Sequence, residues 1–242
     1  MSFYRSLLAA VVLAFCVTIP TLAQDRVAFN PPVDPDGDLD SPGGGTRGDG
    51  CYDFEASESA SLIALSPQNS QLAQTQEAQP KFRVFVASSE AKYGVFTLQD
   101  LDGRVHYRAD TIALPTKDGV VTIDLPSDIE LAPNQTYRWF LEVLCSGSID
   151  PNNPIAEGQI QRITGISTGS YPTSSVNFSV GNTEVDAIPT ILAQVEAYRR
   201  SNLWYEAIDL LATARQDYPD DDRLNQSWYD LLEMAGIPSL NL

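Results

Sequence analysis

The sequence predicts a mainly β chain with an α-helical tail, in which an antiparallel β-sandwich precedes a three-helix module. Two observations carry this prediction. Between residues 51 and 165, short segments alternate apolar and polar residues with a period of two, and turn residues separate them. From residue 186 onward the apolar period changes to 3.6, the period of a helix. We therefore expect a sandwich domain at 51–165 and a helical module at 186–242.

The chain begins with the pattern of a secretory signal peptide, residues 1–23. Arg5 precedes an uninterrupted apolar run from residue 7 to residue 17, and Thr21-Leu22-Ala23 provides a small-residue cleavage site. The run is shorter than the ~20 apolar residues that a membrane-spanning helix needs. We therefore expect cleavage after Ala23, no transmembrane segment in the mature chain, and a secreted or periplasmic location.

Residues 24–50 are rich in Pro, Gly and Asp, which predicts a flexible lead-in without a core. Four of its carboxylates alternate along the chain, and carboxylates are ligands that Ca²⁺ prefers. They are Asp34, Asp36, Asp38 and Asp40. A loop that starts at Asp34 or Asp36 lacks the Gly and the acidic residue that an EF-hand needs at positions six and twelve. These residues are weak Ca²⁺ candidates, and a solvated acidic turn is the main interpretation.

The end of the lead-in, "SPGGGTRGDGC", contains Arg47-Gly48-Asp49, a tripeptide that adhesion receptors read. It also resembles a phosphate-binding loop, but it lacks the Gly-Lys-Ser/Thr ending and follows no predicted strand. We interpret the stretch as a flexible, turn-forming segment.

Cys51 and Cys145 remain as an even pair once Cys16 leaves with the signal peptide. In an exported chain such a pair predicts a disulfide. On the chain-entropy model, a loop of this length is worth about 4–5 kcal/mol. A metal-binding thiol is the rival interpretation, and a chain with one histidine offers a poor zinc ligand set.

The sandwich strands are predicted at 81–88, 93–100, 104–110, 119–126, 136–145 and 157–163. In the first of them Phe82, Val84 and Val86 face one side, whereas Arg83 and Phe85 face the other. Asp102-Gly103 is a hairpin turn signal. A Ser/Thr/Gly-rich linker is expected at 166–185, with one edge strand at 176–180.

Tyr137 opens a late strand whose inward face also carries Trp139, Leu141, Val143 and Cys145. A tyrosine in this position, after an apolar corner, resembles the tyrosine corner of immunoglobulin-like sandwiches. The resemblance implies that the Tyr137 hydroxyl bonds to the backbone upstream. In immunoglobulin domains the cysteine follows two residues after this tyrosine, whereas here it follows eight residues later.

Three helices are predicted after residue 186, with Asp186 as the N-cap of the first and Gly236 and Pro238 ending the third. Residues of the first two helices have the spacing of one tetratricopeptide repeat: Tyr198, Ala207, Leu211, Ala214 and Pro219. One repeat cannot bury its own apolar faces. We therefore expect the three helices to pack together first and to dock on the sandwich second.

No residue is predicted to be catalytic. His106 is the only histidine, and its strand period places it on the outer face with Arg104 and Arg108. A hydrolase serine elbow is absent from the sequence. The acidic residues are too numerous for a catalytic pair to be nominated.

With 15 Lys and Arg against 32 Asp and Glu, the net charge of −17 argues against nucleic acid as a partner. We predict no cofactor.

An ordered set of residues resembles the domain-of-unknown-function family 928, found mainly in cyanobacteria. The set comprises Gly45, Thr46, Arg47, Gly48, Cys51, Tyr137, Trp139, Cys145, Gln161 and Arg162. The family usually has one residue between its Arg-Gly and its Cys, whereas Asp49 and Gly50 supply two here. The resemblance covers roughly residue 30 to the C-terminus. It implies export and a helical tail with Trp228, Leu231 and Leu232, and it implies no activity.

We therefore predict an exported, non-enzymatic binding or scaffolding protein of the cell envelope that acts through contacts with a protein partner. The alternatives are a carboxylate-dependent hydrolase of envelope polysaccharide and a weakly Ca²⁺-dependent carbohydrate-binding module. An enzyme should have a deep cleft with converging carboxyl groups of raised pKa, and a binding module should have an exposed patch instead.

Overall fold

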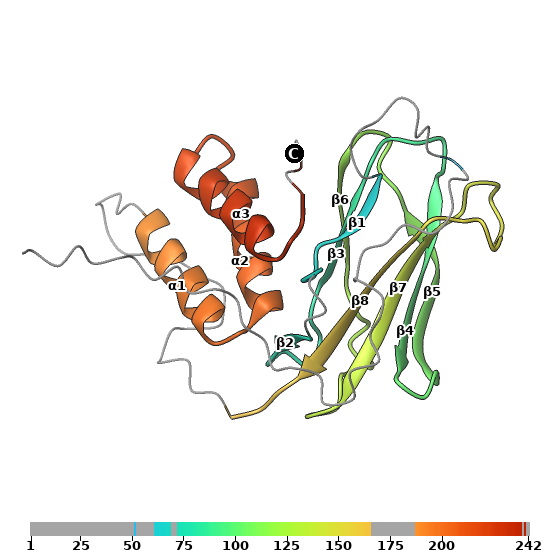
Figure 1. Ribbon diagram of the computed structural model, residues 1–242, viewed down its shortest axis with the longest axis horizontal. Coiled ribbons are helices and arrows are strands. Elements are labelled where there is room, and N and C mark those ends of the chain that lie inside the picture. Colours follow the sequence, from blue (N-terminus) through green and yellow to red (C-terminus); the bar gives the residue numbers. More distant parts are fainter. Residues whose placement is uncertain (1–50, 52–60, 69–71, 166–186, 239, 241–242) are drawn as a thin grey trace, which may run out of the picture.

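The structure, a computed structural model, describes residues 51, 61–68, 72–165, 187–238 and 240 (Figure 1). The predicted signal peptide, the whole of the predicted lead-in and the linker, including the predicted edge strand at 176–180, lie outside these residues. Within the described ranges no helix is long and apolar enough to cross a bilayer.

In the described part of the chain, eight strands form two sheets that pack face to face. The small sheet has the order β1-β3-β6 and is antiparallel, and the large sheet has the order β2-β8-β7-β4-β5. The strands are β1 (Leu62–Ala64), β2 (Ala73–Thr75), β3 (Phe82–Val86), β4 (Tyr93–Asp100), β5 (Val105–Ala113), β6 (Gly119–Ile123), β7 (Thr136–Val143) and β8 (Ile155–Arg162). A mainly β chain with two sheets and three C-terminal helices is therefore confirmed.

Two of these strands were not predicted, and one of them corrects the expected strand direction. β1 and β2 have three residues each, too few to show a period of two. β2 pairs with β8 in the parallel direction, so the sandwich is not wholly antiparallel. The sequence shows no signal for this pairing, because it joins segments more than eighty residues apart.

The core lies between the two sheets, where aromatic rings meet. The ring of Phe82 on β3 lies 5.0 Å from that of Phe96 on β4 and 5.4 Å from that of Trp139 on β7, between centroids. Along β7 buried and half-buried residues alternate, as the period of two predicts. Tyr137, Trp139, Leu141 and Val143 are the buried set.

Helices α1 (Ile188–Arg200), α2 (Trp204–Asp217) and α3 (Asp222–Met234) occupy the predicted positions. The N-cap position of α1 falls on Ala187, which makes no side-chain capping bond, rather than on Asp186, which lies outside the described residues. Asp221 caps α3 by accepting hydrogen bonds from the backbone N–H groups of Arg223 and Leu224. Beyond α3, Gly236 has a φ of 73°, which suits glycine at a helix end, as predicted.

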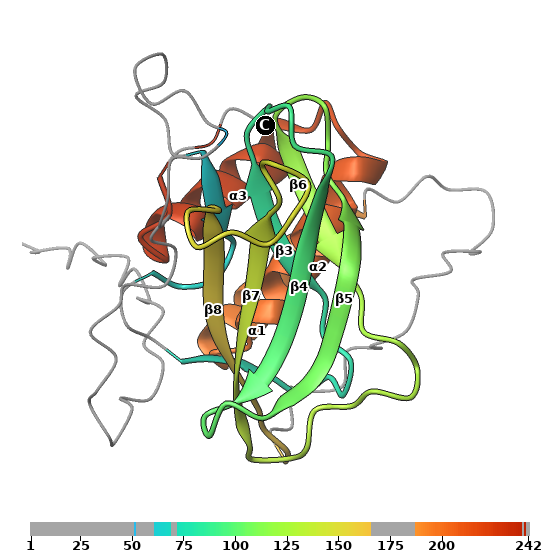
Figure 2. The same ribbon diagram turned by 90° about the vertical axis from the view of Figure 1, so that its right-hand side faces the viewer.

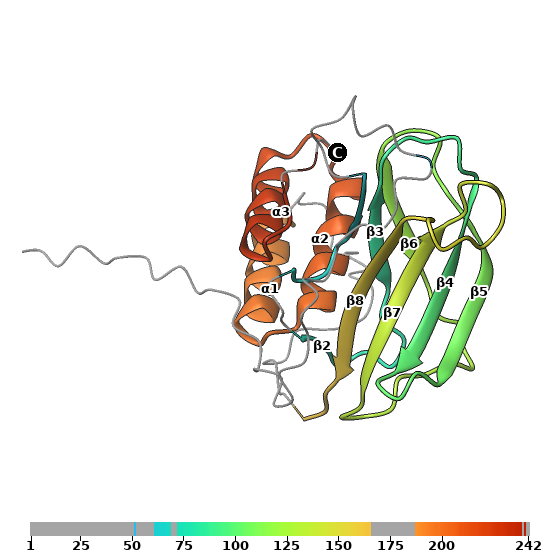
Figure 3. The same ribbon diagram turned by 45° about the vertical axis from the view of Figure 1, so that its right-hand side comes forward.

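The helical module covers the outer face of the small sheet, so the molecule has three layers (Figures 1 and 3). Every residue of β3 is buried, because its inward face meets the large sheet and its outward face meets helix α2. Arg83, which points outward, forms an ion pair with Asp209 of α2. The prediction that the helical module docks on the sandwich is confirmed.

The N-terminal turn of α2 joins the module to the sandwich. Trp204 donates its indole N–H to the Leu65 carbonyl oxygen at 2.9 Å. The Tyr205 hydroxyl accepts a hydrogen bond from the Trp139 indole N–H at 2.8 Å, and the Tyr205 ring lies 5.9 Å from that of Phe82. Tyr205 therefore belongs to the sandwich core as much as to the helix.

Candidate functional site

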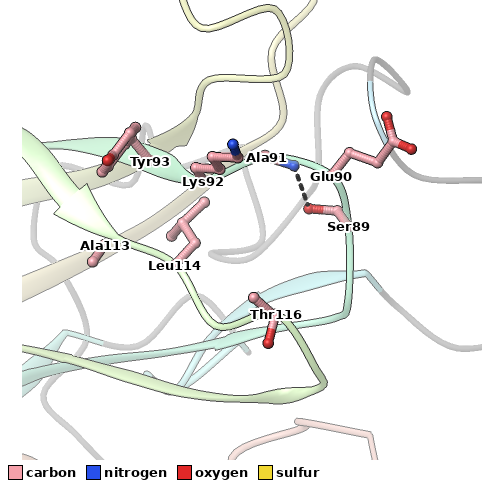
Figure 4. A pocket seen from close by; sticks show the side chains of 8 residues that line it. All are labelled: Ser89, Glu90, Ala91, Lys92, Tyr93, Ala113, Leu114 and Thr116. Atoms are coloured by element: carbon pink, nitrogen blue, oxygen red, sulfur yellow. Dashed lines mark hydrogen bonds between the residues drawn. The ribbon is translucent and has the colours of Figure 1, made fainter.

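A pocket of about 500 Å³ lies at the end of the sandwich where the β3–β4 loop meets the end of β5 (Figure 4). It is lined by Ser89, Glu90, Ala91, Lys92, Tyr93, Ala113, Leu114 and Thr116. The loop is fixed against β5 because the Leu114 N–H donates to the Lys92 carbonyl oxygen at 3.0 Å. Ala91 and Leu114 are buried and provide the apolar part of the lining.

The polar groups around this pocket include a single carboxylate. Glu90 is the only carboxylate of the lining, and in Figure 4 its side chain extends away from Lys92. The Ser89 hydroxyl accepts a hydrogen bond from the Ala91 N–H at 3.3 Å. Paired carboxyl groups, which glycoside hydrolysis requires, are therefore absent from this lining. The pocket offers an apolar floor with hydrogen-bonding groups at its rim.

The pocket adjoins the outer face of the large sheet, which the helices leave uncovered. Figure 2 shows strands β8, β7, β4 and β5 in front of the three helices. Tyr93 and Ala113 pair across β4 and β5, and both are exposed. Tyr93, with 48% of its surface exposed, therefore lies both at the pocket rim and on this face.

The middle of the outer face carries an aromatic ring beside a cation. The Arg138 guanidinium lies 5.6 Å from the centroid of the Phe140 ring and 3.6 Å from the Glu157 carboxylate. All three side chains are half-buried, on β7 and β8. Flat groups with mixed polarity are common at protein interfaces, where aromatic residues and arginine are enriched.

The structure corrects the predicted position of His106. The pairing of β4 with β5 shifts between Leu98 and Gln99, so that Tyr107 lies opposite Leu98 while Val105 lies opposite Gln99. At this β-bulge the imidazole lies beside the buried ring of Tyr137 instead of on the outer face. Its ring lies 5.2 Å from the Tyr137 ring, and its Nε2 lies 2.9 Å from the Asp100 carboxylate.

The contact between His106 and Asp100 is a structural bond of the β4–β5 hairpin. Hydrogen bonds from His106 and from the Arg104 N–H lower the pKa of the Asp100 carboxyl. Among the described residues no serine or cysteine bonds to this histidine. Within that part of the chain the pair thus has no bonded serine or cysteine of the kind that acts as nucleophile in a catalytic triad.

The residues that carry the family resemblance hold the architecture together. The Tyr137 hydroxyl accepts a hydrogen bond from the Ala132 N–H at 3.0 Å, which confirms the predicted bond to the upstream backbone. Arg162 donates to the Leu131 carbonyl oxygen at 2.7 Å in the same turn. Gln161 bonds to the Gln74 and Thr136 side chains across the large sheet. Trp139, as described above, bonds to Tyr205 of α2.

The structure contains the predicted disulfide between Cys51 and Cys145. Cys145 follows Leu144, whose N–H donates to the Tyr93 carbonyl oxygen at 3.0 Å, so the disulfide lies near the pocket.

The weak Ca²⁺ candidates lie outside the described residues; they are Asp34, Asp36, Asp38 and Asp40. So do Gly45, Thr46, Arg47 and Gly48. Within the part that is described, no group of three or more His, Cys, Asp or Glu residues could hold a metal ion.

The most perturbed carboxyl group of the described chain was not predicted from the sequence. Burial raises the pKa of Glu206 to about 7, and this residue lies in the first turn of α2 rather than in the pocket. The available signal was a single acidic residue within the apolar stretch Leu203-Trp204-Tyr205-Glu206-Ala207-Ile208. A lone charge in such a run indicates a buried group with specific partners.

A family model described as Domain of Unknown Function (DUF928) matches residues 42–241. The comparison with curated proteins finds no match.

Proposed function

Because the chain belongs to the DUF928 family, whose description states no activity, we propose from its surface that it is a non-enzymatic binding protein of the cell envelope. The observation that carries the proposal is the uncovered outer face of the large sheet (Figure 2). Helix α2 packs the helical module against the small sheet. The face that the helices leave uncovered continues into the pocket at Tyr93, and we propose that a protein partner binds there.

The two parts of the chain are proposed to be immunoglobulin-like and tetratricopeptide-like. The tyrosine corner at Tyr137 supports the first assignment. The second is supported by α1 and α2, in which Tyr198, Ala207, Leu211 and Ala214 are buried at the spacing of the repeat. In both cases the assignment describes an architecture that other binding domains use, and it implies no reaction.

Export is proposed because the sequence of residues 1–23 has the pattern of a signal peptide and the structure contains a disulfide. Disulfides persist in oxidising compartments such as the periplasm and the cell exterior. The partner would therefore be an envelope protein.

The proposal is tested by capture of partners from an envelope fraction with tagged mature protein. We expect a reproducible set of captured proteins to be lost when Arg138→Glu and Phe140→Ser are combined, because these changes alter the centre of the outer face. The control is Tyr229→Ser on α3, an exposed aromatic residue of the helical module, and it should retain the set. Thermal melts should show that both variants fold. Capture that is unchanged by the double substitution, or lost with the control, would contradict the proposal.

A further inference from the structure

Glu206 is the only acidic residue of the described chain that is buried, with 8% of its surface exposed. It lies in the first turn of α2, between Tyr205 and Ala207, where the helical module meets the sandwich. A carboxylate in this position loses its hydration, and protein groups must replace that hydration if the charged form is to persist.

The partners of Glu206 come from β2 and from the residue that follows it. Its Oε1 accepts a hydrogen bond from the Gln76 N–H at 2.6 Å and another from the Thr75 hydroxyl at 3.0 Å. Its Oε2 is buried and finds no hydrogen-bond partner in the described structure. No ion pair joins Glu206 to a Lys, Arg or His there, so no cation compensates the negative charge.

The neighbouring titratable groups do not supply positive charge either. Glu77, just after β2, repels an ionised Glu206. On the helices, Tyr198 of α1 and Tyr205 of α2 interact electrostatically with Glu206, and Asp209 of α2 acts on Tyr198. The cations of β3 and of the segment before it, Arg83 and Lys81, are already engaged by Asp209.

We propose that Glu206 makes the attachment of the helical module to the sandwich dependent on pH, holding α2 against β2 more firmly when its carboxyl is protonated than when it is ionised. This inference does not rest on the binding function proposed above. Burial is the main cause that raises the pKa of Glu206 to about 7, and Glu77 adds to it. In the unfolded chain a glutamate titrates near pH 4.3.

The sign of the effect follows from the raised pKa. The Glu206 carboxyl binds its proton more tightly when α2 is packed against β2 than when this contact is open. The stabilisation of the contact is therefore complete below the pKa of glutamate in the unfolded chain. This stabilisation is lost as the pH rises through about 7, where Glu206 ionises even while α2 is packed against β2. The window of change therefore lies between about pH 4.5 and pH 7.5.

Hydrogen exchange of the full mature chain, compared with that of Glu206→Gln, tests the proposal. The neutral amide can still accept both hydrogen bonds through its oxygen. Between pH 5.5 and pH 8, exchange at 73–77 and 203–209, corrected for intrinsic rates, should rise on the order of 30-fold in the wild type. It should change little in Glu206→Gln. The control Glu196→Gln, on α1, should show the same rise as the wild type. Peptides from β4 and β7 should change little with pH in every protein.

Equal pH dependence in the wild type and in Glu206→Gln would overturn the proposal. If Glu206→Gln does not fold, a ¹³C NMR titration of the wild-type carboxyl decides the question instead. A midpoint close to 7 supports the proposal, and a midpoint close to that of free glutamate overturns it.

Discussion

Gly158 of β8 shows how a single residue sets the geometry of the core. A Cβ atom added at this position would lie 2.6 Å from two carbon atoms of the Trp139 indole. The indole can therefore lie flat over β8 and reach Tyr205 with its N–H only because residue 158 has no side chain. The contact between the sandwich and the helices at Tyr205 therefore depends on the lack of a side chain at residue 158.

We expect Gly158→Ala to lower the free energy of unfolding by about 1–3 kcal/mol or more, because the new methyl group displaces a ring that is fully buried. Denaturant melts monitored by far-UV circular dichroism measure the change. The matched control is Gly119→Ala in β6, where an added Cβ would meet its nearest atom at 3.7 Å. A loss that is equal in the two variants would show that the indole contact is not the cause.

At the level of the element, helix α2 is the central member of the molecule. Its first turn enters the sandwich core through Tyr205 and bonds β2 through Glu206, while its later residues pack against α1 and α3. The helical module therefore has no separate core of its own. Damage to the packing of α3 reaches the sandwich through α2.

We expect Trp228→Ala to cost about 3–5 kcal/mol, as for other buried aromatic residues, because Trp228 has 1% of its surface exposed. The loss should appear as one cooperative transition shifted to lower denaturant for helices and strands alike. Circular dichroism reports on the helices, and the fluorescence of Trp139 and Trp204 reports on the contact between α2 and the sandwich. The neighbouring residue Tyr229, 37% exposed on the same helix, gives a control in which Tyr229→Ala should cost less than about 0.5 kcal/mol. Two separate transitions would show that the module unfolds independently.

The elements that the sequence predicted are those whose periodicity is long enough to be visible. Strands β3 to β8 and all three helices have five or more residues with a consistent period. β1, β2 and the bulge at His106 were missed because each depends on a partner distant in the sequence or on a single extra residue. The pocket could not be predicted for the same reason, since it joins a loop near Ser89 to residues near Leu114.

At the level of the whole molecule, the disulfide links Cys51, at the start of the sandwich, to Cys145, at the start of the β7–β8 loop. It spans 94 residues of sequence and encloses β1 to β7. Such a cross-link stabilises mainly by restricting the unfolded chain.

We expect the mature protein, purified without reductant from an oxidising compartment, to show no alkylatable thiol under denaturing conditions. After reduction it should show two. Cys51→Ser should lower the free energy of unfolding by about 2–5 kcal/mol, the usual cost of losing a native disulfide. Two alkylatable thiols before reduction would contradict the pairing.

The contacts of Trp204 and Tyr205 also determine when the fold can be completed. Trp204 bonds to Leu65 across 139 positions of sequence, and Tyr205 fills a core built from β3, β4 and β7. During synthesis or translocation from the N-terminus, all eight strands therefore emerge before the residues that close their core. Until α2 arrives, the outward face of β3 and the indole of Trp139 remain open to water or to other chains. The sandwich therefore completes its fold late, although its strands come first in the sequence. The risk of aggregation is greatest until the last helices have emerged.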